Sequence, residues 1–185
     1  RSDIVDYEAE LVVVIGKAGK DIDKNSAWDY VAGLTVGQDI SDRSVQFHAI
    51  PPQFNLGKSF DTFGPIGPIL VSPDMFADKS ALELECWVNG EQRQKANTND
   101  FIFDIPYVIS YISEFITLQP GDLIFTGTPE GVGAMQGKLL KDGDILSTSI
   151  EGIGAIENKC VRISNHSNHK FIPSFIKDKL GLSDE

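Results

Sequence analysis

Cysteine is scarce in this sequence: its 185 residues include only two, Cys86 and Cys160. Both stand alone in apolar, strand-like contexts, and the three histidines show no zinc-ligand spacing with them. We therefore predict two buried thiols, without a disulfide or a zinc site. Unpaired thiols are typical of a reducing compartment, so we expect a cytoplasmic location.

Long apolar runs and basic runs are also lacking. No apolar stretch approaches the roughly 20 residues of a membrane-spanning helix, and the sequence opens with charge rather than a secretory signal. The formal net charge is -11, so neither nucleic acid nor a membrane is an expected partner. An anionic substrate would need a local positive centre, supplied by a metal ion, lysine or arginine.

Two common catalytic motifs are absent as well. No G-x-S-x-G elbow exists, which leaves a serine hydrolase without support. The glycine-rich segment 126–133 is not a Walker A loop, because no G-K-[ST] follows it. The sequence therefore contains neither of these two motifs.

The residues present predict one α+β, mainly β domain over 1–163, followed by a polar linker and a short C-terminal helix over 164–185. The chain is 41% hydrophobic and 23% charged, which is ordinary for a protein with a core. We expect a mixed or antiparallel sheet with two or three flanking helices. Apolar and β-branched patterns predict strands over 11–16, 34–40, 82–88, 91–95, 123–125, 145–150 and 156–163. Capping and apolar spacing predict helices over 26–33, 104–116 and 171–180, with a turn or two of helix at 41–47 and a loop at 50–68.

An E-x-E motif opens the first predicted strand. Side chains alternate along a strand, so Glu8 and Glu10 project from the same side. Two neighbouring carboxylates repel each other unless a cation lies between them, and oxygen ligands suit magnesium, calcium or manganese. Taken alone, the motif is more typical of two solvated glutamates at a strand edge.

Further polar residues stand at the ends of elements or in loops. Alone, each has an ordinary interpretation, such as a helix cap, a surface ion pair or a turn. Together they suit an enzyme acting on a small anionic oxo acid, in which carboxylates hold a cation and lysine and arginine stabilise charge on oxygen. The set comprises Glu8, Glu10, Asp39, Arg43, Gln46, Lys58, Thr62 and Thr128.

Taken in order, several segments resemble the C-terminal catalytic domain of the fumarylacetoacetate hydrolase family. Each segment is weak evidence by itself, whereas their shared order and spacing over about residues 5–161 is specific. The matching segments are Asp6-Tyr7-Glu8-Ala9-Glu10-Leu11, Tyr30-Val31-Ala32-Gly33, Asp39-Ile40-Ser41-Asp42-Arg43, Gly57-Lys58-Ser59-Phe60-Asp61, Val88-Asn89-Gly90-Glu91 and Pro120-Gly121-Asp122 followed by Thr126-Gly127-Thr128-Pro129-Glu130-Gly131-Val132-Gly133.

The resemblance implies roles for several residues. It implies a magnesium or manganese site on Glu8, Glu10 and Asp39. It further implies a rolled mixed β-sheet and a homodimer. The catalytic residues would be Lys58, Arg43 and Gln46, and substrate would be bound by Thr62, Thr128 and Gly127.

The implied activity is cleavage of a carbon–carbon bond in a 2-oxo acid or acylpyruvate, by hydrolysis or decarboxylation, through a metal-stabilised enolate. An isomerase or hydratase would use the same enolate, and the sequence does not separate these reactions. In the family's hydrolases, a segment before the E-x-E strand supplies a His/Glu pair that activates water, so a chain without that pair would favour decarboxylation. Two other readings are a non-catalytic, metal-stabilised domain that binds a small acid and a calcium-stabilised structural domain.

Overall fold

A computed structural model of the chain describes residues 4–163 and 172–181. Strands dominate it, which confirms the α+β, mainly β class. The elements, with η for 3-10 helices, are β1 (Val5–Asp6), β2 (Ala9–Ile15), η1 (Lys24–Tyr30), β3 (Val31–Gln38), β4 (Ser41–Asp42), α1 (Arg43–Gln46), η2 (Leu56–Lys58), β5 (Ile66–Val71), η3 (Pro73–Met75), β6 (Glu83–Val88), β7 (Glu91–Asn97), η4 (Thr98–Asp100), α2 (Ile105–Ser113), β8 (Leu123–Phe125), α3 (Gly133–Gln136), β9 (Ile145–Ile150), β10 (Gly154–Lys159) and α4 (Ser174–Leu180).

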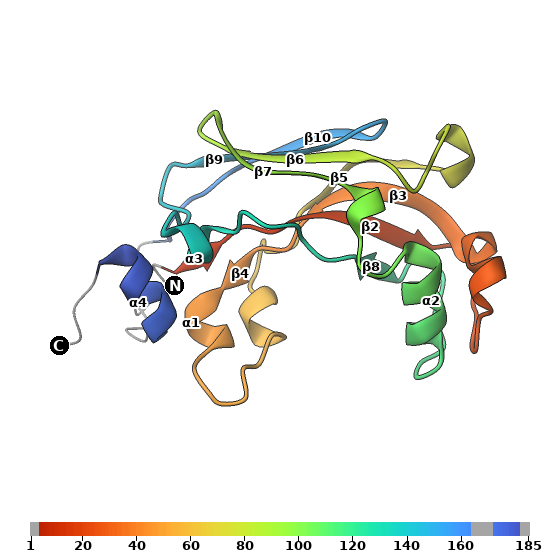
Figure 1. The fold of residues 1–185 in the computed structure, drawn as a ribbon, viewed down its shortest axis with the longest axis horizontal. Coiled ribbons are helices and arrows are strands. Elements are labelled where there is room, and N and C mark those ends of the chain that lie inside the picture. The colour runs from red at the N-terminus through yellow and green to blue at the C-terminus, as the bar shows by residue number, and fades with distance from the viewer. Residues whose placement is uncertain (1–3, 164–171, 182–185) are drawn as a thin grey trace.

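Two four-stranded sheets lie in two layers (Figure 1). One has the strand order β10-β9-β6-β7 and the other β5-β3-β2-β8, while β1 and β4 form a separate pair. Every pairing between described strands is antiparallel, so the implied mixed sheet is wrong in this respect. Tight connections such as the Asn89-Gly90 turn between β6 and β7 force neighbouring strands to run in opposite directions.

The hydrophobic core lies between the two sheets, and the alternation of side chains along the strands builds it. In β2, every second residue from Ala9 to Ile15 belongs to this core. The opposing sheet contributes Leu84, Cys86 and Val88 from β6, among others. The intervening positions of β2 therefore face away from the core, and Glu10 is one of them.

A β-bulge interrupts the pairing of β2 with β3. Val14 pairs with Gly33 and Ile15 with Val31, so Ala32 is an extra residue in β3. On the other side of the bulge the register runs without interruption from Val14 to Ala9, which pairs with Gln38. This register fixes which residues of the two strands stand opposite each other where β2 begins.

The helix predicted over 26–33 is shorter and begins earlier than expected. It is the 3-10 helix η1, capped by Asp23, whose carboxylate accepts a hydrogen bond from the backbone of Asn25. Strand β3 starts directly at Val31, because this segment pairs with β2 and the tertiary pairing overrides the local helical pattern.

The loop predicted over 50–68 ends sooner than expected, since strand β5 begins at Ile66 and pairs with β3. In the sequence, Pro68 indicates a loop and not a strand. Strand β5 accommodates the proline because β5 lies at the edge of its sheet. Strand β10 also departs from the prediction, because it starts at Gly154 and ends at Lys159 instead of running to residue 163.

The remaining elements agree better with their predictions. Helix α2 is capped by Asp104 and has Pro106 in its first turn, as expected, although it ends at Ser113. Helix α4 lies within the predicted 171–180, whereas the linker predicted at 164–170 falls outside the described residues. Both cysteines are free; Cys86 is buried, and Cys160 is only half-buried. In the described ranges, the helices all lack the length and apolar character needed to cross a membrane.

Candidate metal centre

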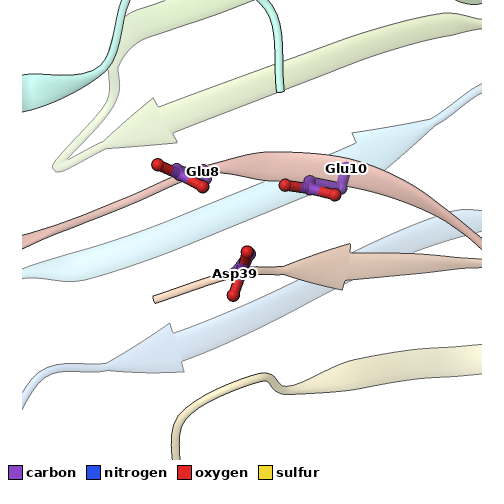
Figure 2. Close-up of side chains that lie close together, drawn as sticks. All are labelled: Glu8, Glu10 and Asp39. Carbon is purple, nitrogen blue, oxygen red and sulfur yellow. The ribbon is translucent and has the colours of Figure 1, made fainter. Parts of the chain in front are cut away.

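Three carboxylates meet where β2 begins and β3 ends (Figure 2). Glu8 precedes β2 and Glu10 lies within it, while Asp39 directly follows β3. The backbone amide of Asp39 donates to the carbonyl of Glu8 at 2.8 Å, which sets these two residues opposite each other. One oxygen from each of the three side chains lies within 4.8 Å of the others. The predicted convergence of the three acids is thus present in the structure.

Burial makes this cluster costly to ionise. Glu10 is 3% exposed, and burial raises its pKa to about 8, although the hydrogen bond from the Gly127 amide at 2.7 Å opposes the shift. Burial also raises the pKa of Asp39, against the hydrogen bond and charge of Lys58. Three ionised acids this close need compensating positive charge. The all-oxygen donor set fits a hard divalent cation such as Mg²⁺ or Mn²⁺.

Lys58 lies directly against the carboxylates. Its ammonium forms ion pairs with Glu8, at 2.8 Å, and with Asp39. Burial alone would lower the pKa of Lys58, but its hydrogen bonds to Asp39 and Glu8 outweigh this and raise it. Lys58 therefore remains a cation at neutral pH. Its position is set by η2, the 3-10 turn that it ends.

Arg43 and Gln46 occupy one face of the single turn α1, as their spacing predicts. The Arg43 guanidinium donates from Nη1 to the Gln46 Oε1 at 2.8 Å, and its Nη2 lies 2.6 Å from the Glu8 Oε1. The Nε2 of Gln46 is buried and has no partner among the described residues. An unpaired buried donor on the amide that Arg43 contacts is suited to a ligand oxygen.

Asp6 opens the first of the segments that carry the family resemblance, but no role was predicted for it. Its side chain is fully buried, and one oxygen accepts hydrogen bonds from the Nε and Nη2 of Arg43 at 3.0 and 2.9 Å. Its carboxylate also accepts from the backbone amides of Gly133 and Ala134 at 2.7 and 2.9 Å. Asp6 thus ties strand β1, helix α1 and the end of the glycine-rich loop together.

Two buried glutamines, also missed, hold the backbone that carries the two glutamates. The Gln38 Oε1 accepts from the amide of Glu8 at 2.9 Å, and the Gln94 Oε1 accepts from the amide of Ala9 at 3.0 Å. Gln94 belongs to β7 in the other sheet, so its side chain links the two layers. A polar residue at an inward-facing strand position was the only sequence signal for Gln94.

The residues predicted to bind substrate have different surroundings. The amide of Gly127 holds Glu10, as described above. The Thr128 hydroxyl donates to the carbonyl of Ala9 at 2.9 Å and accepts from the Gln94 Nε2 at 2.8 Å, so its donor is already used within the protein. Thr62 is exposed and borders a cavity of about 610 Å³ near β10. No hydrogen bond or ion pair within the described ranges joins Thr62 to the carboxylates, and its role stays a prediction.

The chain is similar to known proteins over most of its length. The model of the fumarylacetoacetate (FAA) hydrolase C-terminal family matches residues 1–161. The chain is 47% identical over 168 residues to the fumarylacetoacetate hydrolase domain-containing protein 2 homolog of Dictyostelium discoideum, covering 85% of this chain and 55% of that protein. It is 47% identical over 163 residues to the human mitochondrial oxaloacetate tautomerase FAHD2A, covering 87% and 52% respectively.

Solved structures share the fold. A 5-carboxymethyl-2-hydroxymuconate delta-isomerase from Mycobacterium smegmatis superposes with a TM-score of 0.80 at 40% identity, covering 88% of this chain and 61% of that one. A fumarylpyruvate hydrolase from Pseudomonas aeruginosa, solved with Mn²⁺ and pyruvate, gives a TM-score of 0.80 at 34% identity, with coverages of 87% and 67%. The present chain spans about half the length of the curated relatives that it matches. With the matched residues 1–161 and the carboxylate centre both in place, the chain belongs to the fumarylacetoacetate hydrolase family.

Proposed function

We propose that this protein is a divalent-metal-dependent enzyme that acts on a 2-oxo acid through an enolate. The observation that carries the proposal is the convergence of Glu8, Glu10 and Asp39, with Lys58 in contact with two of them. These three carboxylates would hold Mg²⁺ or Mn²⁺. When bound there, the cation supplies a Lewis acid for the oxygens of the substrate.

The remaining residues would act on the charge that develops on the substrate. Lys58 remains protonated, so it suits stabilising an enolate oxygen and does not suit a general base. The unpaired Nε2 of Gln46 offers a directional hydrogen bond, and Arg43 holds the acceptor end of the same amide. The site therefore combines positive charge with an oriented donor, as an enolate requires.

Within this class, keto–enol conversion of oxaloacetate is the first candidate reaction. It is supported by the relatives named as oxaloacetate tautomerases at 46–48% identity. Cleavage of a carbon–carbon bond in an acylpyruvate is the second candidate. It is supported by the likeness to the fumarylpyruvate hydrolase described above. Both reactions need the same stabilised enolate.

The test is turnover of oxaloacetate by the purified protein with Mn²⁺, followed by the ultraviolet absorbance of the enol. Asp39→Asn removes one ligand charge and is expected to lower kcat/KM at least 100-fold. Asp23→Asn is the matched control, because Asp23 caps η1 at an exposed position, and asparagine caps helices equally well. Full activity in Asp39→Asn, or after exhaustive chelation, would contradict the proposal.

A parallel assay separates the two reactions. Release of pyruvate from an acylpyruvate would indicate cleavage, whereas loss of the enol signal without pyruvate would indicate tautomerisation. If the protein binds Mn²⁺ and oxalate but converts neither substrate, the non-catalytic binding domain is the better description. A preference for calcium over magnesium would favour a structural ion instead.

The assembly and location of the protein stay predictions. A homodimer is expected from the family resemblance, and sedimentation of the purified chain would test it. A cytoplasmic location was expected from the two free thiols, whereas the mammalian and amphibian relatives are named as mitochondrial proteins. Fractionation of the source cells would decide between the compartments.

A further inference from the structure

We propose that Asp6 is a positioning residue that holds Arg43 and so keeps Glu8 available to the metal ion. This inference rests on the proposed function, because it assigns a task to a residue behind the metal centre. Asp6 would not touch the metal or the substrate. It would act through the guanidinium that lies between it and Glu8.

The contacts place Arg43 between two acids. Its Nη2 lies 2.9 Å from the Asp6 Oδ2 and 2.6 Å from the Glu8 Oε1. The side chains of Arg43 and Asp6 are 7% and 0% exposed, so water screens this charge pair little. Asp6 therefore neutralises much of the positive charge of Arg43, which would otherwise interact with Glu8 alone.

Asp6 is itself held firmly. Besides Arg43, its carboxylate accepts hydrogen bonds from the amides of Tyr7, Gly133 and Ala134. A Cβ at Gly133 would lie 2.6 Å from the Asp6 Oδ1, which shows how closely the backbone of α3 surrounds this carboxylate. A group fixed from this many sides can fix the direction of its partner in turn.

Without the charge of Asp6, Arg43 would keep Glu8 as its one anionic partner among the contacts described. The guanidinium would then compete with the metal for the Glu8 carboxylate. A buried pair can also serve stability alone, and breaking such a pair is costly for that reason. The experiment must therefore separate metal affinity from folding.

The first measurement compares Mn²⁺ affinity, by titration calorimetry or electron paramagnetic resonance, in Asp6→Asn and Asp42→Asn. Asp42 is the matched control: it is 1% exposed and adjoins α1, but its Oδ1 accepts hydrogen bonds from Ser44 and Val45, not from the Arg43 guanidinium. We expect the Mn²⁺ Kd to rise 10- to 100-fold in Asp6→Asn and less than threefold in Asp42→Asn. Equal affinities in the two variants would overturn the inference.

The second measurement uses an Arg43→Gln background, which also avoids leaving an unpaired buried cation if Asp6→Asn alone does not fold. If Asp6 acts through Arg43, Asp6→Asn/Arg43→Gln and Arg43→Gln will bind Mn²⁺ with the same affinity. A further loss in the double variant would show that Asp6 acts by another route and would overturn the inference.

Failure of the inference and failure of the proposed function are distinguishable. If the unaltered protein binds Mn²⁺ but converts no 2-oxo acid, the proposed function fails while both affinity comparisons still test Asp6. If the unaltered protein binds Mn²⁺ and turns over oxaloacetate, but Asp6→Asn behaves like Asp42→Asn, only the inference fails. Absence of Mn²⁺ binding in the unaltered protein would overturn both.

Discussion

Glu10 carries a conflict between folding and metal binding. As a buried acid with a pKa of about 8, it stays protonated in the metal-free protein over much of the physiological range. The same carboxylate must ionise to hold a cation. The stability of the metal-free protein should therefore respond to pH through this one side chain.

The direction of this response follows from the two pKa values. Between pH 4.5 and about 8, folded Glu10 keeps a proton that the unfolded chain has released, so the free energy of unfolding falls as pH rises. Glu10→Gln removes this loss. Between pH 4.5 and pH 8, the free energy of unfolding of the metal-free variant should therefore rise by about 4 kcal/mol relative to that of the unaltered chain. Denaturant unfolding in excess chelator measures the difference.

The same variant should lose its affinity for Mn²⁺, so metal-free stability and metal binding change in opposite directions. Glu130→Gln, in an exposed part of the glycine-rich loop, is the control and should alter neither quantity. A metal-free Glu10→Gln protein that is no more stable at pH 8 than the unaltered chain would show that Glu10 ionises without cost.

Lys58 is predicted to act on the reaction more than on the metal. Lys58→Gln removes the ammonium that contacts Glu8 and Asp39, and kcat should fall by about 10²- to 10³-fold, as for other groups that stabilise developing charge. Mn²⁺ affinity should not decrease, because the carboxylates lose a competing partner. Steady-state kinetics at saturating Mn²⁺ measures the effect.

The control for Lys58 is Lys138→Gln, which removes an exposed ion pair with Glu91 and should leave kcat unchanged. If Lys58→Gln weakens Mn²⁺ binding and leaves kcat intact at saturating metal, Lys58 serves the metal site and not the enolate.

Local signals identify only some of the site residues, whereas Asp39 and Lys58 were assigned through the family resemblance. The alternation of Glu8 and Glu10 and the spacing of Arg43 and Gln46 both follow from the periodicity of strand and helix. Asp6 and Gln94 could not be assigned in this way. Their partners lie far along the chain, since Asp6 contacts an arginine 37 positions away and Gln94 holds an amide 85 positions away.

The same limit applies to whole elements. The hairpin of β6 and β7 was predictable because the alternating pattern and the Asn89-Gly90 turn are both local. The start of β3 and the existence of β5 were not, because pairing with β2 and β3 decides them and the local composition suggests a helix and a loop. Local patterns therefore predicted the hairpin of β6 and β7, but neither the start of β3 nor the edge strand β5.

Strand β7 has a structural task that its exposed edge position does not suggest. Gln94 is 2% exposed and serves the Ala9 amide, the Thr128 hydroxyl and the carbonyl of Pro129. Gln94→Leu would leave these buried groups without partners and should reduce the free energy of unfolding by about 2–4 kcal/mol. Gln92→Leu, two positions earlier at an exposed site, should cost less than about 0.5 kcal/mol.

Chemical denaturation of both variants measures the difference. Equal effects would mean that the link between β7 and the start of β2 contributes little. Because the link supports the segment between Glu8 and Glu10, we also expect Gln94→Leu to weaken Mn²⁺ binding.

For the whole molecule, metal binding should appear as thermal stability. Mn²⁺ at 100 times its Kd adds about 2.7 kcal/mol to the free energy of unfolding, which corresponds to a rise in Tm of roughly 5–10 °C for a domain of this size. Differential scanning calorimetry with and without chelator measures the shift. Asp39→Asn should show none, and an equal shift in that variant would locate the ion elsewhere.

The bulge at Ala32 has a consequence for how this chain tolerates changes of length. Deleting Ala32 would leave Val31 and Gly33 opposite the residues that they already face, and Asp39 would remain opposite Glu8. Deleting one residue between Leu34 and Gln38 would instead rotate the Asp39 side chain to the opposite surface of the sheet. Deletion of Ala32 should therefore leave the metal centre intact, whereas deletion of one residue between Leu34 and Gln38 should abolish it.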